Sequence, residues 1–224
     1  MRLNRWLVIH GAAGARRKAD DLIAAGRVRI NGAIAALGDR IDDSDTLTLD
    51  GVYIEPQKPE THLVALNKPT GYVCSHRRQG SAETIFSLLP EEMGEYKIAG
   101  RLDKDSEGLV LLTNDGDLAN SLTHPSHDVA REYQVELSSA LSDEQITTLT
   151  ETGVLLDDEL RKFTALKPID EHRYTITLHE GRNRQIRRSF EVLGVAVLQL
   201  QRIKHGQWEL GDLELGHWRT EQLA

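Results

Sequence analysis

One stretch of the chain, from Ile98 to Leu118, constrains the fold more than any other. Its sequence, IAGRLDKDSEGLVLLTNDGDL, contains an uninterrupted apolar run from Leu109 to Leu112. A short apolar run between polar turns predicts a strand that is buried on both faces of a sheet. Asp103 precedes this strand on a tight polar turn, and residues 113–116 after the strand predict the start of a helix. A carboxylate beside a buried strand has rigid support, which suits a reactive group.

Length and composition limit the class of protein. A chain of 224 residues accommodates one large domain, or a small domain and a medium one. No apolar run is long enough to span a bilayer, and residues 1–14 lack the features of a signal peptide. The single cysteine, Cys74, excludes an intrachain disulfide and a Cys-rich zinc site. We therefore expect a cytoplasmic globular protein that does not associate with membranes.

The net charge of −8 would disfavour nucleic-acid binding if it were evenly spread, but it is not. Seven basic side chains and only two acidic ones occur between residues 1 and 32, and the next acids gather at residues 39–50. Residues 2–9 and 15–25 fit two helices, and residues 27–30 fit a strand with two arginines on one face. Taken alone, such a basic cluster is more typical of a solvated helix face than of a binding site.

The order of these elements changes that interpretation. The segment GAAGARRKADDLIAAGRVRING, from Gly11 to Gly32, resembles the S-four-type (alpha-L) RNA-binding domain. Ala15 stands where that pattern usually has Ser, so a helix N-cap hydroxyl is missing, at a cost of ~1 kcal/mol. We expect this domain to cover residues 1–56, followed by a polar, proline-bearing linker at residues 57–62. The resemblance implies RNA contacts by its basic residues Arg16, Arg17, Lys18, Arg27 and Arg29.

Residues 63–224 contain a series of predicted strands and helices, which indicates a second, larger domain. Apolar or alternating segments predict strands, and longer periodic segments predict helices, one of which opens with the capping box Ser142-Asp143-Glu144-Gln145. The segment at residues 208–218 is rich in turn residues. The expected strands are residues 63–66, 109–112, 131–137, 174–178 and 195–200, and the expected helices are residues 84–89, 115–122, 142–149 and 182–193.

A second basic cluster, RNRQIRR, lies between Arg182 and Arg188. In a helix that starts at residue 182, Arg184, Arg187 and Arg188 would share one face. Helix N-termini favour anions, and guanidinium groups suit phosphates and carboxylates. The alternative is an exposed ion-pairing face, but the nearby acids are too few to neutralise the arginines.

Two other features are weaker. Tyr133 lies on a predicted strand, where it could belong to the core or could stack on an RNA base. His124-Pro-Ser-His127 has the spacing of part of a metal site. No cluster of Cys, His or carboxylates accompanies these histidines, so we interpret them as loop residues.

Together these segments resemble the RsuA/RluB/RluF family of ribosomal RNA pseudouridine synthases, over nearly the whole chain. The family motif G-R-L-D-x-x-[ST]-x-G-L-L-L-L-T-N-D-G corresponds to Gly100–Gly116, and L-N-K-P-x-G-[YV] to Leu66–Tyr72. The motif E-G-x-[NH]-x-Q-[IV]-[RK]-R corresponds to Glu180–Arg188, and L-x-R-x-x-x-G to Leu200–Gly206. Motifs of this length in the same order are highly specific.

The resemblance implies roles for individual residues. Asp103 would be the catalytic aspartate, Tyr133 would stack on the target uracil, and Arg187 would pair with Asp103 and keep it ionised. Leu200 would pack beneath the site. The remaining residues expected to contact RNA in this domain are Lys68, Arg101, Arg182, Arg184 and Arg188.

The resemblance also implies the reaction, site-specific isomerisation of uridine to pseudouridine, which needs no cofactor and no metal. The N1–C1′ bond would break and a C5–C1′ bond would form, with Asp103 attacking C1′ or removing the C2′ proton. The expected partner is ribosomal RNA or a ribosomal-subunit precursor, with large-subunit RNA slightly favoured, and the expected oligomeric state is a monomer. The implied fold class is α+β: a mixed, mainly antiparallel sheet with flanking helices follows the small N-terminal domain.

Two rival interpretations remain. Asp103-Lys-Asp105-Ser106 resembles the D-x-D-x-[TS] motif of haloacid-dehalogenase-type phosphatases, although no strong apolar strand precedes it. The N-terminal domain could instead act alone in a non-catalytic, ribosome-associated RNA-binding protein, although the long second domain argues against this.

Overall fold

The computed structural model describes residues 1–42, 44–56 and 60–223, which divide into two compact units, Met1–Glu60 and Thr61–Ala224. The division falls inside the expected linker, residues 57–62, half of which lies outside the described residues. Each unit has its own apolar core.

The first unit contains two helices and a small sheet. Helices α1 (Leu3–Ile9) and α2 (Arg16–Ala24) pack together, and Trp6, Leu7 and Ile23 lie in the core. The expected capping group is indeed missing, because Ala15 is the N-cap residue of α2 and offers no side-chain hydrogen bond. The sheet has the antiparallel order β2-β1-β3-β4, with bounds Ala33–Ile34, Val28–Ile30, Leu47–Leu49 and Val52–Tyr53.

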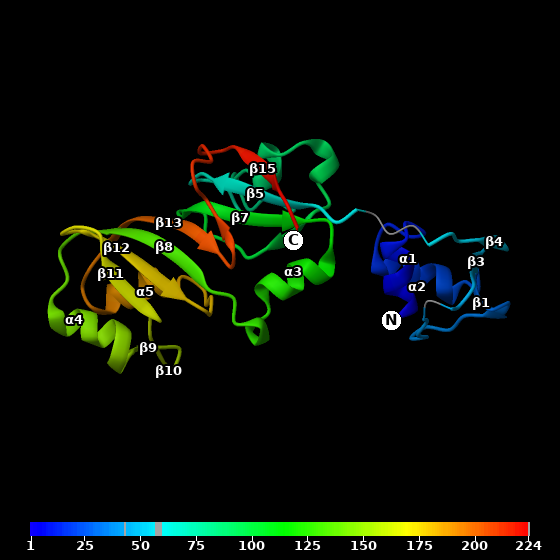
Figure 1. The fold of residues 1–224 in the computed structure, drawn as a ribbon, viewed down its shortest axis with the longest axis horizontal. Coiled ribbons are helices and arrows are strands. Elements are labelled where there is room, and N and C mark those ends of the chain that lie inside the picture. The colour runs from blue at the N-terminus through cyan, green and yellow to red at the C-terminus, as the bar shows by residue number, and fades with distance from the viewer. Residues whose placement is uncertain (43, 57–59, 224) are drawn as a thin grey trace. The chain divides into compact units, whose positions relative to one another are not determined.

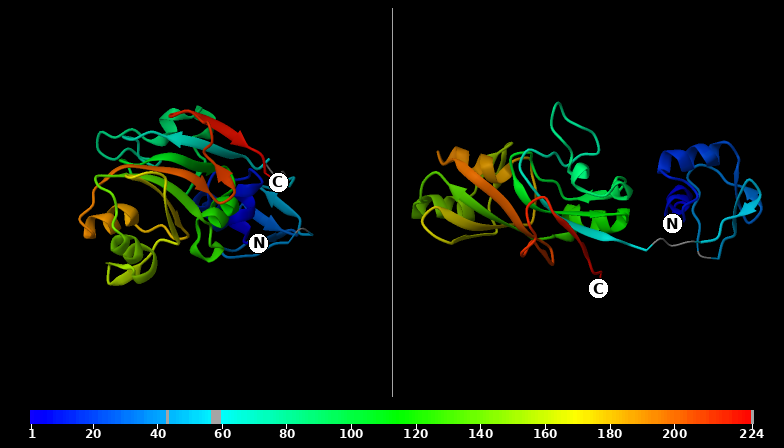
Figure 2. Two further views of the ribbon diagram at one scale, coloured as in Figure 1. Left: turned by 60° about the vertical axis from the view of Figure 1, so that its left-hand side comes forward. Right: turned by 90° about the horizontal axis from the view of Figure 1, so that it is seen from above.

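The second unit is organised around a nine-stranded mixed sheet, in which β7 (Glu107–Thr113) and β13 (Val197–His205) lie side by side at the centre (Figures 1 and 2). The main path has the order β11-β12-β8-β13-β7-β5-β15, while β14 pairs with β13 and β6 with β7. All pairs are antiparallel except β13 with β7, which run parallel through only two residue pairs. The bounds of the other strands are β5 Leu63–Lys68, β6 Lys97–Ala99, β8 Arg131–Leu137, β11 Ala165–Pro168, β12 Arg173–Leu178, β14 Trp208–Glu209 and β15 Trp218–Glu221.

A glycine makes this short parallel junction possible. Gly108 on β7 is paired with Arg202 on β13, and a Cβ atom at Gly108 would lie 2.3 Å from the Arg202 carbonyl oxygen. Gly108 also has φ of +104°, which favours glycine. Any side chain here would separate β7 from β13.

The sheet is flanked by α3 (Gly116–Thr123), α4 (Asp143–Thr147) and α5 (Gln185–Val192). Asp115 caps α3, and Ser142 and Gln145 form the predicted capping box of α4. A π-helical turn, Thr148–Thr152, extends α4, and a separate hairpin, β9 (Val154–Leu156) and β10 (Glu159–Arg161), contacts α5. Single 3-10 turns occur at Ile85–Leu88, Glu91–Met93 and Pro125–His127.

The α+β fold class is confirmed, but several sequence expectations were wrong in detail. The expected helix at residues 84–89 is one 3-10 turn, and α5 begins at Gln185 rather than at residue 182. The segment at residues 208–218 has the expected turns, but it also contains β14 and leads into β15, which pairs with β5 at the sheet edge. Short strands with few apolar residues give little periodicity, and long-range pairing decides them. No helix among the described residues has both the length and the apolarity needed to cross a bilayer.

Candidate active site

Asp103 lies on a loop, residues 100–106, that connects β6 to β7. The loop turns back on itself, with the Ser106 amide donating to the Asp103 carbonyl oxygen at 3.2 Å and the Gly71 amide donating to that of Lys104 at 2.8 Å. The side chain of Asp103 is 34% exposed, so the carboxylate is accessible from one side. The predicted support by a buried strand is present, because Leu109–Leu112 of β7 are fully buried.

Arg202 anchors the beginning of this loop. Its side chain is buried, and the guanidinium donates to the carbonyl oxygens of Gly100 (3.0 Å) and Arg101 (3.4 Å) and to Leu109 on β7 (2.7 Å). A planar group with several donors can satisfy three carbonyls at once, which an ammonium cannot do in this geometry. The loop start is thus fixed to β7 and β13 together.

Lys68 holds the other end of the loop. Its ammonium group donates to the Ser106 carbonyl oxygen at 2.6 Å and to Pro69 at 3.0 Å, and the residue is fully buried. Burial lowers the pKa of Lys68, while the carboxylates of Asp105, Asp103 and Glu107 act in the opposite direction. The expectation that Lys68 contacts RNA was therefore wrong: it has no exposed surface, and its donors bind backbone oxygens.

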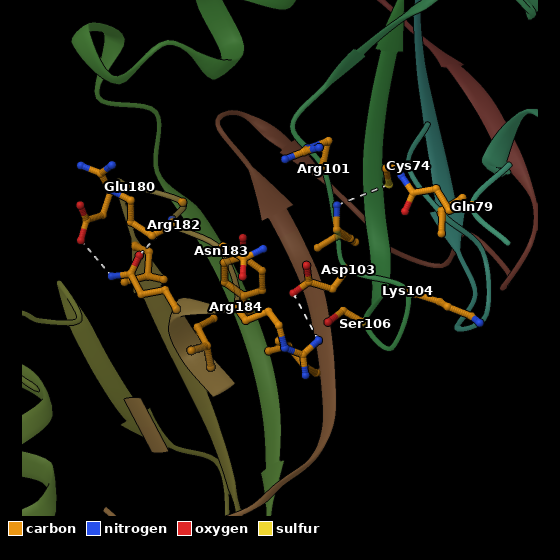
Figure 3. A pocket seen from close by; sticks show the side chains of 18 residues that line it. Cys74, Gln79, Arg101, Asp103, Lys104, Ser106, Glu180, Arg182, Asn183 and Arg184 are labelled. Atoms are coloured by element: carbon orange, nitrogen blue, oxygen red, sulfur yellow. Dashed lines mark hydrogen bonds and ion pairs between the residues drawn. The ribbon is translucent and has the colours of Figure 1, made fainter. Parts of the chain in front are cut away.

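Asp103 faces a cavity of about 390 Å³ whose walls come from distant parts of the chain (Figure 3). Tyr133 on β8, Leu200 on β13 and Ile186 on α5 contribute largely buried side chains, as does Cys74. The amide of Leu102 donates to the Cys74 sulfur at 3.4 Å, and burial raises the pKa of this thiol. The structure thus brings the predicted Asp103, Tyr133 and Leu200 together.

Positively charged and polar side chains line the rest of the cavity. Arg101 and Lys104 lie on the Asp103 loop, whereas Arg182, Asn183 and Arg184 lie on the segment before α5, and all five residues are exposed (Figure 3). Gln185 fixes this segment, because its amide group contacts both the Glu180 carboxylate (2.9 Å) and the Arg182 backbone amide (3.2 Å). Arg101, Arg182 and Arg184, which the sequence analysis expected to contact RNA, thus line the same cavity as Asp103.

The expected pair between Arg187 and Asp103 is not the one that forms. Arg187 donates to the backbone oxygens of Asp105 (2.7 Å) and Val197 (2.9 Å), and its Nε lies 3.5 Å from the Asp105 carboxylate. Arg184 is the arginine near Asp103, with Nη1 3.9 Å from Oδ2. Because α5 starts at Gln185, Arg184 lies just outside the helix and does not share a helical face with Arg187.

Asp105 neutralises part of this positive charge. Both Asp105 oxygens accept hydrogen bonds from Arg184 at 2.8 Å, which lowers the pKa of Asp105, with a further contribution from Arg187. The same pair raises the pKa of Arg184. In the phosphatase interpretation Asp105 would be the second aspartate of the motif, but here its carboxylate is engaged by a guanidinium, and the arrangement does not favour that chemistry.

The other predicted contact residues lie outside this cavity. Arg188 makes a two-point pair with Asp157 on the β9–β10 turn, at 2.8 and 2.7 Å. Arg27 pairs with Asp50, and Arg29 donates to the Gly32 carbonyl oxygen at 3.0 Å. Arg16, Arg17 and Lys18 are exposed at the start of α2. These last five residues belong to the first unit.

Sequence reasoning missed a buried basic cluster behind the site. Arg131 and His205 both reach the Leu122 carbonyl oxygen, at 3.1 and 2.9 Å, so the His205 ring carries its proton on Nε2. Burial, Arg202 and Arg131 lower the pKa of His205 to about 3, which keeps the ring neutral. A Cβ atom at Gly100 would lie 2.7 Å from this ring, and Gly100 has φ of +89°. The sequence signal for this cluster was Arg202, the arginine of the motif at Leu200–Gly206, whereas His205 occupies a position that the motif leaves open.

The histidine pair at residues 124–127 has an ordinary loop role. His124 Nδ1 lies 2.8 Å from the Ser126 hydroxyl oxygen and accepts a hydrogen bond from the Ser126 amide at 3.2 Å. Within residues 1–42, 44–56 and 60–223, no group of three or more His, Cys, Asp or Glu side chains is arranged to hold a metal ion.

Comparison with known proteins agrees with this geometry. Residues 62–192 match the RNA pseudouridylate synthase family model, and residues 1–47 match the S4 domain. The ribosomal large subunit pseudouridine synthase B of Pseudomonas aeruginosa is 38% identical over 216 residues, which are 92% of this chain and 56% of the relative. The protein of the same name from Haemophilus influenzae is 40% identical over 222 residues, 94% of this chain and 62% of the relative.

The chain thus spans about three fifths of the length of these two relatives. A crystal structure of a pseudouridylate synthase superposes with a TM-score of 0.70 at 30% identity, over 99% of this chain and 96% of that one. The family match covers the Asp103 loop, Tyr133 and the segment before α5. This chain belongs to the RNA pseudouridylate synthase family.

Proposed function

We propose that this chain isomerises uridine to pseudouridine in ribosomal RNA, with Asp103 as the reacting carboxylate. The observation that carries the proposal is the position of Asp103 on a doubly held loop, facing a cavity that Tyr133 and Leu200 line. The relatives are named for the large ribosomal subunit, and this supports large-subunit RNA as the substrate. The S4 match supports RNA binding by the first unit.

The cavity suits one nucleotide that has left its stack. The buried ring of Tyr133 and the apolar side chains of Leu200 and Ile186 offer surfaces for a uracil ring, whereas the exposed Arg101 and Arg182 suit the flanking phosphates. A base inside a helix cannot reach Asp103, so the target uridine is flipped or lies in an unpaired element. Water must be kept from C1′ once the base has left, because it would otherwise hydrolyse the glycosyl intermediate, and Tyr133, Leu200 and Ile186 form the apolar side of the cavity.

The reaction is an isomerisation in which every atom is retained. The N1–C1′ bond breaks, the uracil rotates, a C5–C1′ bond forms, and the proton on C5 is replaced by one on N1. Asp103 serves either as a nucleophile at C1′ or as a base at C2′, and both roles require the ionised carboxylate. The Nη1 atom of Arg184 lies 3.9 Å from Oδ2 of Asp103 and adds positive charge to this side of the cavity.

The test is Asp103→Asn, which keeps the shape of the side chain and removes its charge. We expect pseudouridine formation in rRNA to fall by roughly a thousandfold or more, while RNA affinity stays within about threefold. Asp170→Asn is the matched control, because Asp170 is an exposed aspartate paired with Arg173 and does not line the cavity. Turnover by Asp103→Asn at the control rate would refute the role of Asp103.

The substrate needs a separate experiment. Pseudouridines are mapped in both ribosomal subunits of a deletion strain and of the same strain that carries the gene again. We expect one or a few large-subunit sites to lose the modification and then regain it. An unchanged large-subunit pattern, or loss in the small subunit alone, would overturn the large-subunit proposal.

A further inference from the structure

The carboxylate next to the proposed reacting group has no role in the mechanism above. Asp105 is two residues from Asp103, on the same loop, but it does not line the cavity. Both of its oxygens accept hydrogen bonds from Arg184, Nη1 and Nη2 each lying 2.8 Å from one oxygen. A parallel two-point contact fixes both the direction and the distance of a guanidinium.

Arg184 depends on this contact for its position. It is the residue just before α5, and it has a left-handed backbone with φ of 49° and ψ of 29°. A non-glycine residue in this region is strained and persists only where its surroundings hold it. The Asp105 carboxylate holds the Arg184 guanidinium, and Nη1 then lies 3.9 Å from Asp103 Oδ2, too far for a direct hydrogen bond.

Arg187 ties Asp105 down from the other side. Its Nη2 donates to the Asp105 backbone oxygen at 2.7 Å and its Nε lies 3.5 Å from Oδ2, while Nη1 donates to Val197 on β13. Asp105 is therefore fixed to the sheet by one arginine while it holds another. This is the arrangement of a group that positions a cation, because the anchoring arginine is 14% exposed and the held arginine is 42% exposed and lines the cavity.

We propose that Asp105 is a positioning residue for the reaction: it holds Arg184 beside Asp103 and withholds that guanidinium from RNA phosphates. The inference rests on the proposed function. It predicts a trade between two quantities, since the contact that orients Arg184 toward Asp103 also occupies the fork that a phosphate would bind. Removal of the carboxylate should slow the chemical step and tighten RNA binding.

The primary experiment is Asp105→Asn, assayed with an rRNA fragment that the wild-type protein modifies. We expect single-turnover pseudouridine formation at saturating protein to fall by about tenfold or more, because Arg184 loses its fixed position. RNA affinity should rise by about threefold at low salt, because one negative charge is gone and one guanidinium is free. The slope of log affinity against log salt concentration should become steeper by about one.

A matched control comes from the neighbouring arginine. Asp157 makes the same two-point contact with Arg188, at 2.7 and 2.8 Å, but neither residue lines the cavity. Asp157→Asn should leave the rate of the chemical step unchanged. Asp105→Glu retains a carboxylate that can reach the guanidinium, and it should restore most of the rate that Asp105→Asn loses.

A double variant tests whether Asp105 acts on the reaction through Arg184. Arg184→Gln removes the held cation, so adding Asp105→Asn to it should slow the chemical step by no more than a further twofold or so. If Asp105→Asn reacts at the wild-type rate, if its loss of rate is fully additive with that of Arg184→Gln, or if RNA affinity falls together with rate, the inference is overturned. A wild-type protein that forms no pseudouridine in any rRNA would instead refute the proposed function, and the inference with it.

Discussion

The two units of the molecule place some of their arginine and lysine side chains differently, exposed in the first unit and buried in the second. In the first unit, Arg16, Arg17 and Lys18 are exposed on α2, where water and counterions can reach them. In the second unit, Lys68 and Arg202 are buried and donate only to backbone carbonyl oxygens. An exposed cation stays hydrated and is available to phosphates. A buried cation loses its hydration, and its hydrogen bonds must offset that desolvation free energy.

The comparison shows that local charge density does not reveal what a cation does. The dense cluster at residues 1–32 indicates a basic surface, but Lys68 and Arg202, the buried cations that support the Asp103 loop, are far apart in the chain. Lys68 and Arg202 approach the same loop from β5 and β13. If this distinction holds, substitutions in the two units should affect different observables.

The largest effect on folding is expected for Arg202→Gln. Three carbonyl oxygens lose a charged donor, and we expect the free energy of unfolding of the second unit to fall by about 3 kcal/mol or more. The matched variant Arg17→Gln on α2 should change stability by less than about 0.5 kcal/mol. Calorimetry on both variants measures the difference in unfolding free energy. Equal losses of stability would show that the buried and the exposed arginine do not differ in this respect.

The pH dependence of stability should carry the signature of His205. Its folded pKa is about 3, below the ordinary value of 6.5, so between these values the unfolded chain binds a proton that the folded chain does not. Stability due to this group is therefore complete above pH 6.5 and falls as the pH drops, by about 1.4 kcal/mol per unit. His205→Gln should flatten the curve between pH 6.5 and 4 relative to wild type, as followed by urea unfolding. Parallel curves would show that the ring is charged or exposed.

Lys68→Met should cost less than Arg202→Gln. The variant removes two hydrogen bonds, to Pro69 and Ser106, but it also removes the penalty of burying an ammonium group. We expect a loss of about 1–2 kcal/mol in unfolding free energy, together with slower pseudouridine formation because the end of the Asp103 loop is released. A loss of RNA affinity without a loss of stability would contradict this interpretation and would show that Lys68 contacts RNA.

The smallest effect on stability, and a distinct one on binding, is expected for the triple variant Arg16→Ala, Arg17→Ala, Lys18→Ala. Unfolding should change by less than about 0.5 kcal/mol. Binding to rRNA should weaken for all sequences alike, and the salt dependence of affinity should flatten by up to about two or three. An unchanged salt slope, measured by fluorescence anisotropy, would remove α2 from the RNA-binding surface.

Much of the architecture was predictable from local sequence. The apolar run at Leu109–Leu112, the alternation in Arg131–Leu137 and the Ser142 capping box each gave an element of the correct type. The strands at Ala165–Pro168 and Trp218–Glu221 were not predicted, because they are stabilised by pairing with distant strands rather than by a periodic pattern.

The sequence by itself predicted the fold class, the S4-type N-terminal domain and Asp103 as the candidate carboxylate, since each prediction depends on residue type and on spacing along a short segment. Only the tertiary structure decided which arginine approaches Asp103, because that depends on where α5 begins and on how its residues meet the loop before β7. The same is true of Lys68 and Arg202, because no local sequence pattern indicates that their side chains are buried. Their role as buried supports arises from β5, β7 and β13 meeting at one junction, which no segment of the sequence contains.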